Sequence, residues 1–270
     1  MFAQDSLDVF TEYYDFDGPL ESHWCDFEND LANFCWSSFY DNHRHMDFSS
    51  ENFKHSLLYC LHDDLEEQTE CHVEEMRGVF ENWVDTIDVS SAKTVFVFPE
   101  DIKFFTFNYT STLQSVYGIS EDRVFHVHGS LKSDDELVFG HGEKAMAEMP
   151  ELDENGDRNS SVFTYAENAA KYPFYAFQKN VNEIIKSNRC VFESFDSMSK
   201  IIVLGHSINE VDRPYFREIA KFAPQAKWFV SFFEEKEELH HLDALIGCGI
   251  VRENIQICTW SELKSIVFAS

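Results

Sequence analysis

Basic residues are scarce in this sequence. Lysine and arginine together number 21, against 49 aspartate and glutamate residues, and the formal net charge is −28 at neutral pH. A chain with this charge repels a phosphate backbone, which argues against direct binding of nucleic acid. The ordinary consequence of the charge is that it keeps the folded chain soluble.

Paired cysteines and long apolar runs are also missing. The seven cysteines include no Cys-x-x-Cys pair, and their odd number is typical of reduced thiols rather than of a disulfide framework or a zinc site. No apolar run approaches the length needed to cross a bilayer, and the acidic N-terminus lacks the basic flank of a signal peptide. We therefore expect a cytoplasmic protein that does not bind a membrane.

Several motifs of common enzymes are lacking as well. The Gly-Lys-Ser/Thr of a P-loop occurs nowhere. Asn209 stands two residues after Ser207, where the nucleophile elbow of a serine hydrolase needs glycine. The many carboxylates show no spacing that indicates a metal-dependent nuclease. His126, His128 and His141 lack the spacing of metal ligands, so the sequence predicts no metal.

Two patterns of apolar residues divide the chain. Up to about residue 90, apolar residues recur at every third and fourth position, which predicts helices. Short β-branched or aromatic runs follow, which predict strands. The predicted strands are Thr94–Phe98, Phe104–Asn108, Val124–His128, Glu136–Gly140, the apolar part of Lys200–Ser207, Ala226–Phe233 and Ile255–Thr259.

The order of these runs predicts an α/β fold. Strands and helices alternate with short turns after residue 200, which favours parallel pairing in a Rossmann-like, mostly parallel sheet with helices on both faces. We expect a helical region at 1–90 packed on the core of a Rossmann-like domain at 91–270. That domain would carry an insertion at about 148–199, with a polar loop at 148–161 and helices broken near Pro173.

Polar residues directly after the apolar runs are the candidate site residues. In open parallel sheets, ligands bind beyond the carboxyl ends of the strands. Asn108, His128 and the turn Gly205–Ser207 each end a run, and Ser231 lies inside another. The turn predicts backbone N–H groups and the Ser207 hydroxyl at a helix N-terminus, which suits a phosphate or a ribose hydroxyl.

Each candidate also has a purely structural interpretation. Ser207 could cap the helix while Asp212 bonds the loop, and Asn108 could satisfy loop backbone groups. His128 could be a hydrogen-bonded interior histidine, with His126 on the opposite face of the strand.

Four segments in a fixed order add to this interpretation. They are FNYTSTLQSVYG, FHVHGSL, LVFGHG and IIVLGHSINEVDRPYF. This set resembles the bacteriophage abortive-infection AbiH family. The upstream segment HWCDFENDL resembles the first helical motif of that family through Trp24 and Glu28.

The resemblance implies a site, because the family is similar in layout to the sirtuin-like NAD-binding fold. It implies NAD or a related nucleotide as ligand and a glycohydrolase as activity. Asn108 would orient a water or a ribose hydroxyl, and His128 would accept a proton. Both would be the catalytic residues. The nucleotide-binding residues implied are Tyr109, Thr110, Gly129, Gly205, His206, Ser207, Asp212 and Ser231.

The chain departs from this pattern at its start. No strand followed by Gly-x-Gly precedes the first helix, so the glycine-loop strand of the expected sheet is missing. A missing central strand leaves unpaired backbone groups, which a protein partner or a second copy of the chain could satisfy. The alternative function is therefore a catalytically silent sirtuin-like module, acting as a sensor or a subunit of a defence complex. Deacetylation is not expected, because the two Cys-x-x-Cys zinc pairs of that subfamily are absent.

Overall fold

The chain folds as a mixed α/β protein in a computed structural model that describes residues 13–14, 28–43, 57–133, 136–143, 146 and 163–267. It divides into two compact units. The first unit combines Met1–Asp88 with His128–Lys179, and the second combines Val89–Val127 with Asn180–Ser270. No helix in the described parts of the chain has both the length and the apolar character that a membrane span requires.

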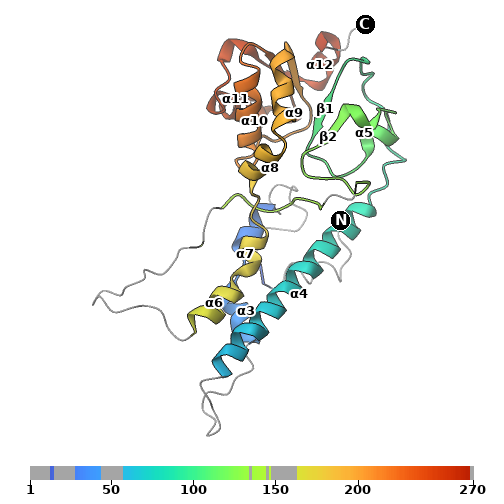
Figure 1. Ribbon diagram of the computed structural model, residues 1–270. Coiled ribbons are helices and arrows are strands. Elements are labelled where there is room, and N and C mark those ends of the chain that lie inside the picture. Colours follow the sequence, from blue (N-terminus) through green and yellow to red (C-terminus); the bar gives the residue numbers. More distant parts are fainter. Residues whose placement is uncertain are drawn as a thin grey trace, which may run out of the picture. The chain divides into compact units, whose positions relative to one another are not determined.

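Helices build the first unit. Helix α4 (Leu57–Asp85) packs along α6 (Thr164–Ala170) and α7 (Tyr172–Ala176), and α3 (Trp36–His43) packs on α4 and α6 (Figure 1). The face that α4 turns to the core carries Leu61, Leu65, Met76 and Phe80, each at most 1% exposed. Their spacing keeps them on one face of a helix, which confirms the predicted helical N-terminal region.

The predicted helix break near Pro173 is also confirmed. Helix α6 ends at Ala170 and α7 begins at Tyr172, with Pro173 in its first turn. Proline lacks an N–H and fixes φ, so it is tolerated there and not inside a continuous helix. The predicted polar loop at 148–161 lies outside the described residues.

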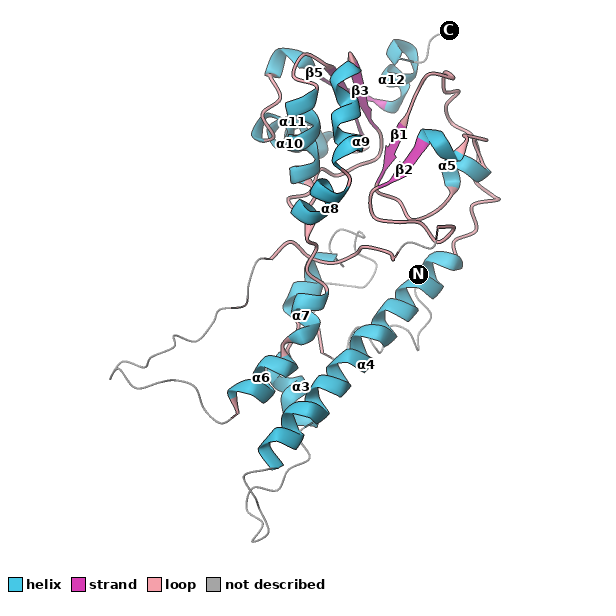
Figure 2. Cartoon of the chain, in the orientation of Figure 1, coloured by secondary structure: helices cyan, strands magenta, loops and turns pink. Residues whose placement is uncertain are grey.

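The second unit contains two small parallel sheets (Figure 2). Strand β1 (Phe104–Thr106) pairs with β2 (Val124–His126), and β3 (Lys200–Val203) pairs with β4 (Lys227–Phe232), which pairs with β5 (Ile255–Thr259). The helices of this unit are α5 (Thr112–Ser115), α8 (Val181–Ser187), α9 (Arg189–Glu193), α10 (Arg213–Phe222), α11 (Glu235–Gly247) and α12 (Trp260–Val267).

One apolar core joins the two sheets of the second unit. Trp228 and Val230 of β4 are buried in it together with Tyr215 and Phe216 of α10. Phe105 of β1 packs against the same core. The strands β3, β4 and β5 pair in parallel, which confirms the parallel pairing predicted for the runs after residue 200. The described strands form two sheets rather than one, so a single Rossmann-like or sirtuin-like sheet stays a prediction.

Two predicted strands are wrong. Residues 94–98 run as a loop in which the Val95 N–H donates to the Tyr117 hydroxyl, while Phe96 packs on Trp260. Residues 136–140 also form no strand, and Gly140 leaves the β region with φ +140°. An apolar, β-branched run becomes a strand only where a neighbouring strand completes its hydrogen-bond ladder, which these segments lack.

Candidate functional site

The segments that follow β1 and β3 meet in the second unit. Phe107 follows β1, and its ring lies 4.2 Å, between centroids, from the ring of His206 in the turn after β3. Phe107 also stacks on Phe216 of α10 at 5.9 Å. The neighbouring residues Asn108 and Ser207 are both exposed. The aromatic contact therefore brings together two of the predicted site segments, at the edge where parallel sheets bind ligands.

A buried serine anchors the turn after β3. Gly205 has φ +60°, a left-handed conformation that glycine adopts without a steric cost. Its N–H donates to the Ser231 Oγ at 3.3 Å, and the Ser231 hydroxyl donates to the Val203 carbonyl at the same distance. Ser231 is only 2% exposed, so its hydroxyl holds the turn against β4.

The predicted binding residues His206 and Asp212 also hold this turn. The Ile208 N–H donates to His206 Nδ1 at 2.8 Å, and His206 Nε2 lies 3.6 Å from an Asp212 carboxylate oxygen. Ile208 is fully buried with φ +54°, which is unfavourable for a β-branched residue. The His206 and Asp212 side chains thus maintain a strained loop.

Ser207 is not at a helix N-terminus, contrary to the prediction. Helix α10 begins only at Arg213, and its N-cap Asp212 makes no side-chain capping bond. The residues after Gly205 form the strained loop instead of continuing into a helix. Ser207 therefore lies in that loop as an exposed residue and is not the N-cap.

Asn108 is fixed through its backbone. Its N–H donates to Thr106 Oγ1 at 3.1 Å, and its carbonyl accepts from His126 Nδ1 at 2.8 Å. Tyr109 and Thr110, the binding residues predicted beside it, are less exposed than Asn108. Tyr109 is 8% exposed, and the Thr110 hydroxyl shares a 2.9 Å hydrogen bond with the Thr112 hydroxyl. The Asn108 side chain is therefore exposed, while hydrogen bonds fix its backbone.

The residue that sequence reasoning missed at this site is His126. Its Nδ1 hydrogen-bonds to the Asn108 carbonyl and its Nε2 to the side-chain nitrogen of Gln114, 3.0 Å away, so both ring nitrogens are held. Gln114 also donates to Glu121 at 3.0 Å. The repeated His in "HVH" carried the signal, but the position of the strand end was not readable from the sequence.

His128 is not at the end of β2, contrary to the prediction. Strand β2 ends at His126, because β1 ends at Thr106 and offers no further ladder partner, and the Val127 N–H donates to the Thr106 carbonyl. His128 is 2% exposed and belongs to the first unit, whereas Asn108 belongs to the second. Gly129 follows with φ +81°. His128 and Gly129 therefore do not lie in the same unit as Asn108.

The first unit contains a buried ion pair at two of the quoted motifs. Lys179 Nζ lies 2.7 Å from Glu28 Oε1, with side chains 1% and 7% exposed. The Gly140 N–H points at the same oxygen, 3.5 Å away. His141 is fully buried, and its Nε2–H donates to the Phe174 carbonyl at 2.9 Å. Burial lowers the His141 pKa, so its imidazole is neutral at pH 7.

This ion pair joins sequence segments that had no predicted connection. Glu28 belongs to the first helical motif, Gly140 to the GHG turn, and Lys179 was not singled out. Trp24, the other residue of that helical motif, lies outside the described residues. A buried charge pair is costly unless both partners stay matched, so the pair fixes these segments to one another.

Comparisons with known proteins agree with the motif order. No match was found among curated proteins or among solved structures. The family model described as Bacteriophage abortive infection AbiH matches residues 3–232, which is most of the chain. The protein therefore belongs to the AbiH family of bacteriophage abortive-infection proteins.

Proposed function

We propose that this AbiH-family protein binds NAD or a related nucleotide at the edge formed by Asn108 and the Gly205–Ser207 turn, and cleaves its N-glycosidic bond. The observation that carries the proposal is the 4.2 Å contact between Phe107 and His206. It brings two exposed polar groups, the Asn108 amide and the Ser207 hydroxyl, to the carboxyl ends of parallel strands.

The chemistry assigned to these residues is modest. Glycosidic cleavage passes through an oxocarbenium-like ribose, so the site must hold the ribose and position a water. The Asn108 amide can orient that water, and His126 is a positioning residue because it fixes the Asn108 carbonyl. Tyr109 and Thr110 stay proposed contacts beside Asn108. His128 and Gly129 belong to the other unit, so the predicted proton acceptance by His128 stays a separate proposal.

A specific observation favours the silent binding module as the second candidate. The titratable side chains of the turn, His206 and Asp212, already hold the loop, and Ser231 anchors it. General acid–base catalysis needs a group within reach of the reacting proton. A turn whose ionisable groups are committed to structure suits nucleotide binding without cleavage, as in a sensor or a subunit of a defence complex.

Incubation of the full chain with NAD separates the two candidates. Nicotinamide release and the shift in melting temperature are measured for the wild type, for Asn108→Ala and for Ser207→Ala. Both substituted side chains are exposed, so both variants should fold. Asn82→Ala, an exposed site on α4, is the matched control.

Each outcome decides one point. Release that falls at least tenfold in both variants and persists in Asn82→Ala supports the glycohydrolase. A melting shift that needs Asn108 and Ser207, without release, supports the binding module. If the wild type shows neither release nor a shift, nucleotide binding is wrong.

A further inference from the structure

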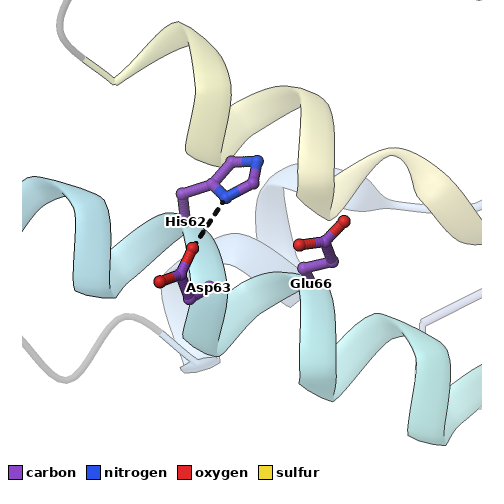
Figure 3. Close-up of side chains that lie close together, drawn as sticks. All are labelled: His62, Asp63 and Glu66. Atoms are coloured by element: carbon purple, nitrogen blue, oxygen red, sulfur yellow. Dashed lines mark hydrogen bonds and ion pairs between the residues drawn. The ribbon is translucent and has the colours of Figure 1, made fainter.

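Helix α4 carries a group of metal-ligating side chains outside the site described above. His62, Asp63 and Glu66 each offer one ligand atom, and these atoms lie within 4.8 Å of one another. Figure 3 shows His62 and Glu66 one helical turn apart, with Asp63 hydrogen-bonded to His62. Residues four apart in a helix lie on the same face, so the backbone of α4 itself sets this arrangement.

Two of these side chains, His62 and Glu66, also form one wall of a pocket of about 290 Å³ within the first unit. Helix α4 contributes His62, Glu66, Thr69 and Glu70 to the pocket lining. The opposite wall comes from α6 and α7, where the Tyr165 ring lies edge-on to His62 with centroids 6.4 Å apart. The histidine is therefore held at a hollow between helices.

Among the residues that the structure describes, the pocket lining is acidic. It includes Glu66 and Glu70 but no lysine or arginine. Lys171 lies just before the lining residue Tyr172, and its ammonium group is over the ring of Trp36, 4.7 Å from the centroid. Like charges at positions i and i+4 of a helix destabilise it. A bound cation would relieve that repulsion.

We propose that His62, Asp63 and Glu66 bind a divalent transition-metal ion of the Zn²⁺ type on α4, at the edge of this pocket. Zinc with ligands at about 2.1 Å in a tetrahedron holds its ligand atoms ~3.4 Å apart. His62 Nδ1 and Asp63 Oδ1 are already 3.3 Å apart. The exposed Glu66 side chain reaches the ion by rotation about its side-chain bonds.

The ligand set selects the class of metal. Imidazole nitrogen favours Zn²⁺ and its neighbours, whereas Mg²⁺ and Ca²⁺ prefer ligand sets made only of oxygen. Three protein ligands leave a coordination position, as in zinc sites that keep a bound water. The pocket lined by His62 and Glu66 has room for the water or small ligand that would fill this position.

The test is calorimetric titration of the metal-free full chain with Zn²⁺, without nucleotide. We expect one saturable site whose affinity falls at least tenfold in His62→Ala and in Glu66→Gln. His240→Ala and Glu238→Gln, at exposed positions on α11, are matched controls and should bind as the wild type. Circular dichroism checks that all variants keep their helices.

Cobalt substitution guards against binding by cysteines, since Cys60, Cys71 and Cys190 are exposed. Co²⁺ at this site should give visible d–d bands without the strong near-ultraviolet band of a thiolate ligand. The proposal is overturned by a thiolate band, by the absence of a saturable Zn²⁺ site, or by unchanged affinity in both ligand variants. None of these results bears on the nucleotide proposal, which uses residues of the second unit.

Discussion

At the scale of single residues, a buried histidine makes the stability of the first unit depend on pH. His72 is 8% exposed, and its ring lies among those of Tyr13, Tyr14 and Phe34, with centroids 5.7 to 6.1 Å away. Burial, with a smaller contribution from the charge of His43, lowers the pKa of His72 to about 4. The folded chain therefore resists protonation of this ring.

Replacing His72 by phenylalanine should remove part of the acid sensitivity. Between pH 6.5 and about 4 the unfolded chain binds a proton at His72 that the folded chain does not, so the free energy of unfolding falls as the pH falls. Between pH 7 and pH 4.5 this one group contributes a loss of roughly 2 kcal/mol. His72→Phe keeps an aromatic ring and should lose that much less than the wild type, measured by urea unfolding at both pH values.

The control for this prediction is His240→Phe, at an exposed histidine of α11. It should keep the pH dependence of the wild type, because the substitution leaves the buried ring of His72 in place. Equal losses of stability in His72→Phe and the wild type would show that His72 does not carry the effect.

At the scale of elements, Gly140 holds the GHG turn against the segment that follows α7. Its φ is +140°, and a Cβ at this position would lie 1.8 Å from the Phe177 carbonyl oxygen. That oxygen accepts the His141 N–H at 2.9 Å, and the Lys179 N–H donates to the His141 carbonyl at the same distance. A side chain at 140 would separate these two paired segments.

Two glycine-to-alanine substitutions should therefore differ in sign. Gly140→Ala should destabilise the chain by about 3 kcal/mol, because it combines backbone strain with the loss of these bonds. Gly78→Ala lies in helix α4, where the new Cβ has no atom within 4 Å apart from its chain neighbours and the helix backbone, and should stabilise by about 0.5 to 1 kcal/mol. Chemical denaturation measures both values. A Gly140→Ala variant as stable as the wild type would contradict the close approach to Phe177.

At the scale of elements, some strands could be predicted from the sequence and others could not. The runs that became β3, β4 and β5 were predictable, because compact apolar segments alternate with helices over a short stretch of chain. The runs at 94–98 and 136–140 have similar composition, but their partners decide whether they pair, and composition carries no information on partners.

Some features of the candidate site could likewise be predicted from the sequence, and others could not. Asn108 and Gly205 could be found because each follows a local apolar run. The place of His126 beside Asn108 depends on where β1 stops, and the pairing of Glu28 with Lys179 depends on contacts between segments far apart in the chain. The hydrogen bond from the Ile208 N–H to His206 belongs to a strained turn that no local sequence pattern predicts.

At the scale of the whole molecule, charge repulsion competes with ion pairing. The ion pairs between Lys186 and Glu183 and between Lys221 and Glu218 each lie within one exposed helical turn. Pairs of this kind contribute about 0.2 to 0.5 kcal/mol each. The net charge of −28 acts against the compact state everywhere. Repulsion should therefore outweigh attraction, and screening should stabilise the chain.

Moderate salt should raise the melting temperature. Between 10 and 150 mM NaCl the Debye length falls from ~30 to ~8 Å, which screens repulsion between distant charges more than it weakens contacts within a helical turn. We expect a rise of ~3 °C or more, measured by scanning calorimetry, because about 1 kcal/mol shifts the midpoint of a chain this size by ~2–4 °C. Choline chloride at equal ionic strength should give the same rise, since screening does not depend on the identity of the cation. A melting temperature that falls with salt would mean that the local ion pairs, and not the net charge, dominate the electrostatic free energy of folding.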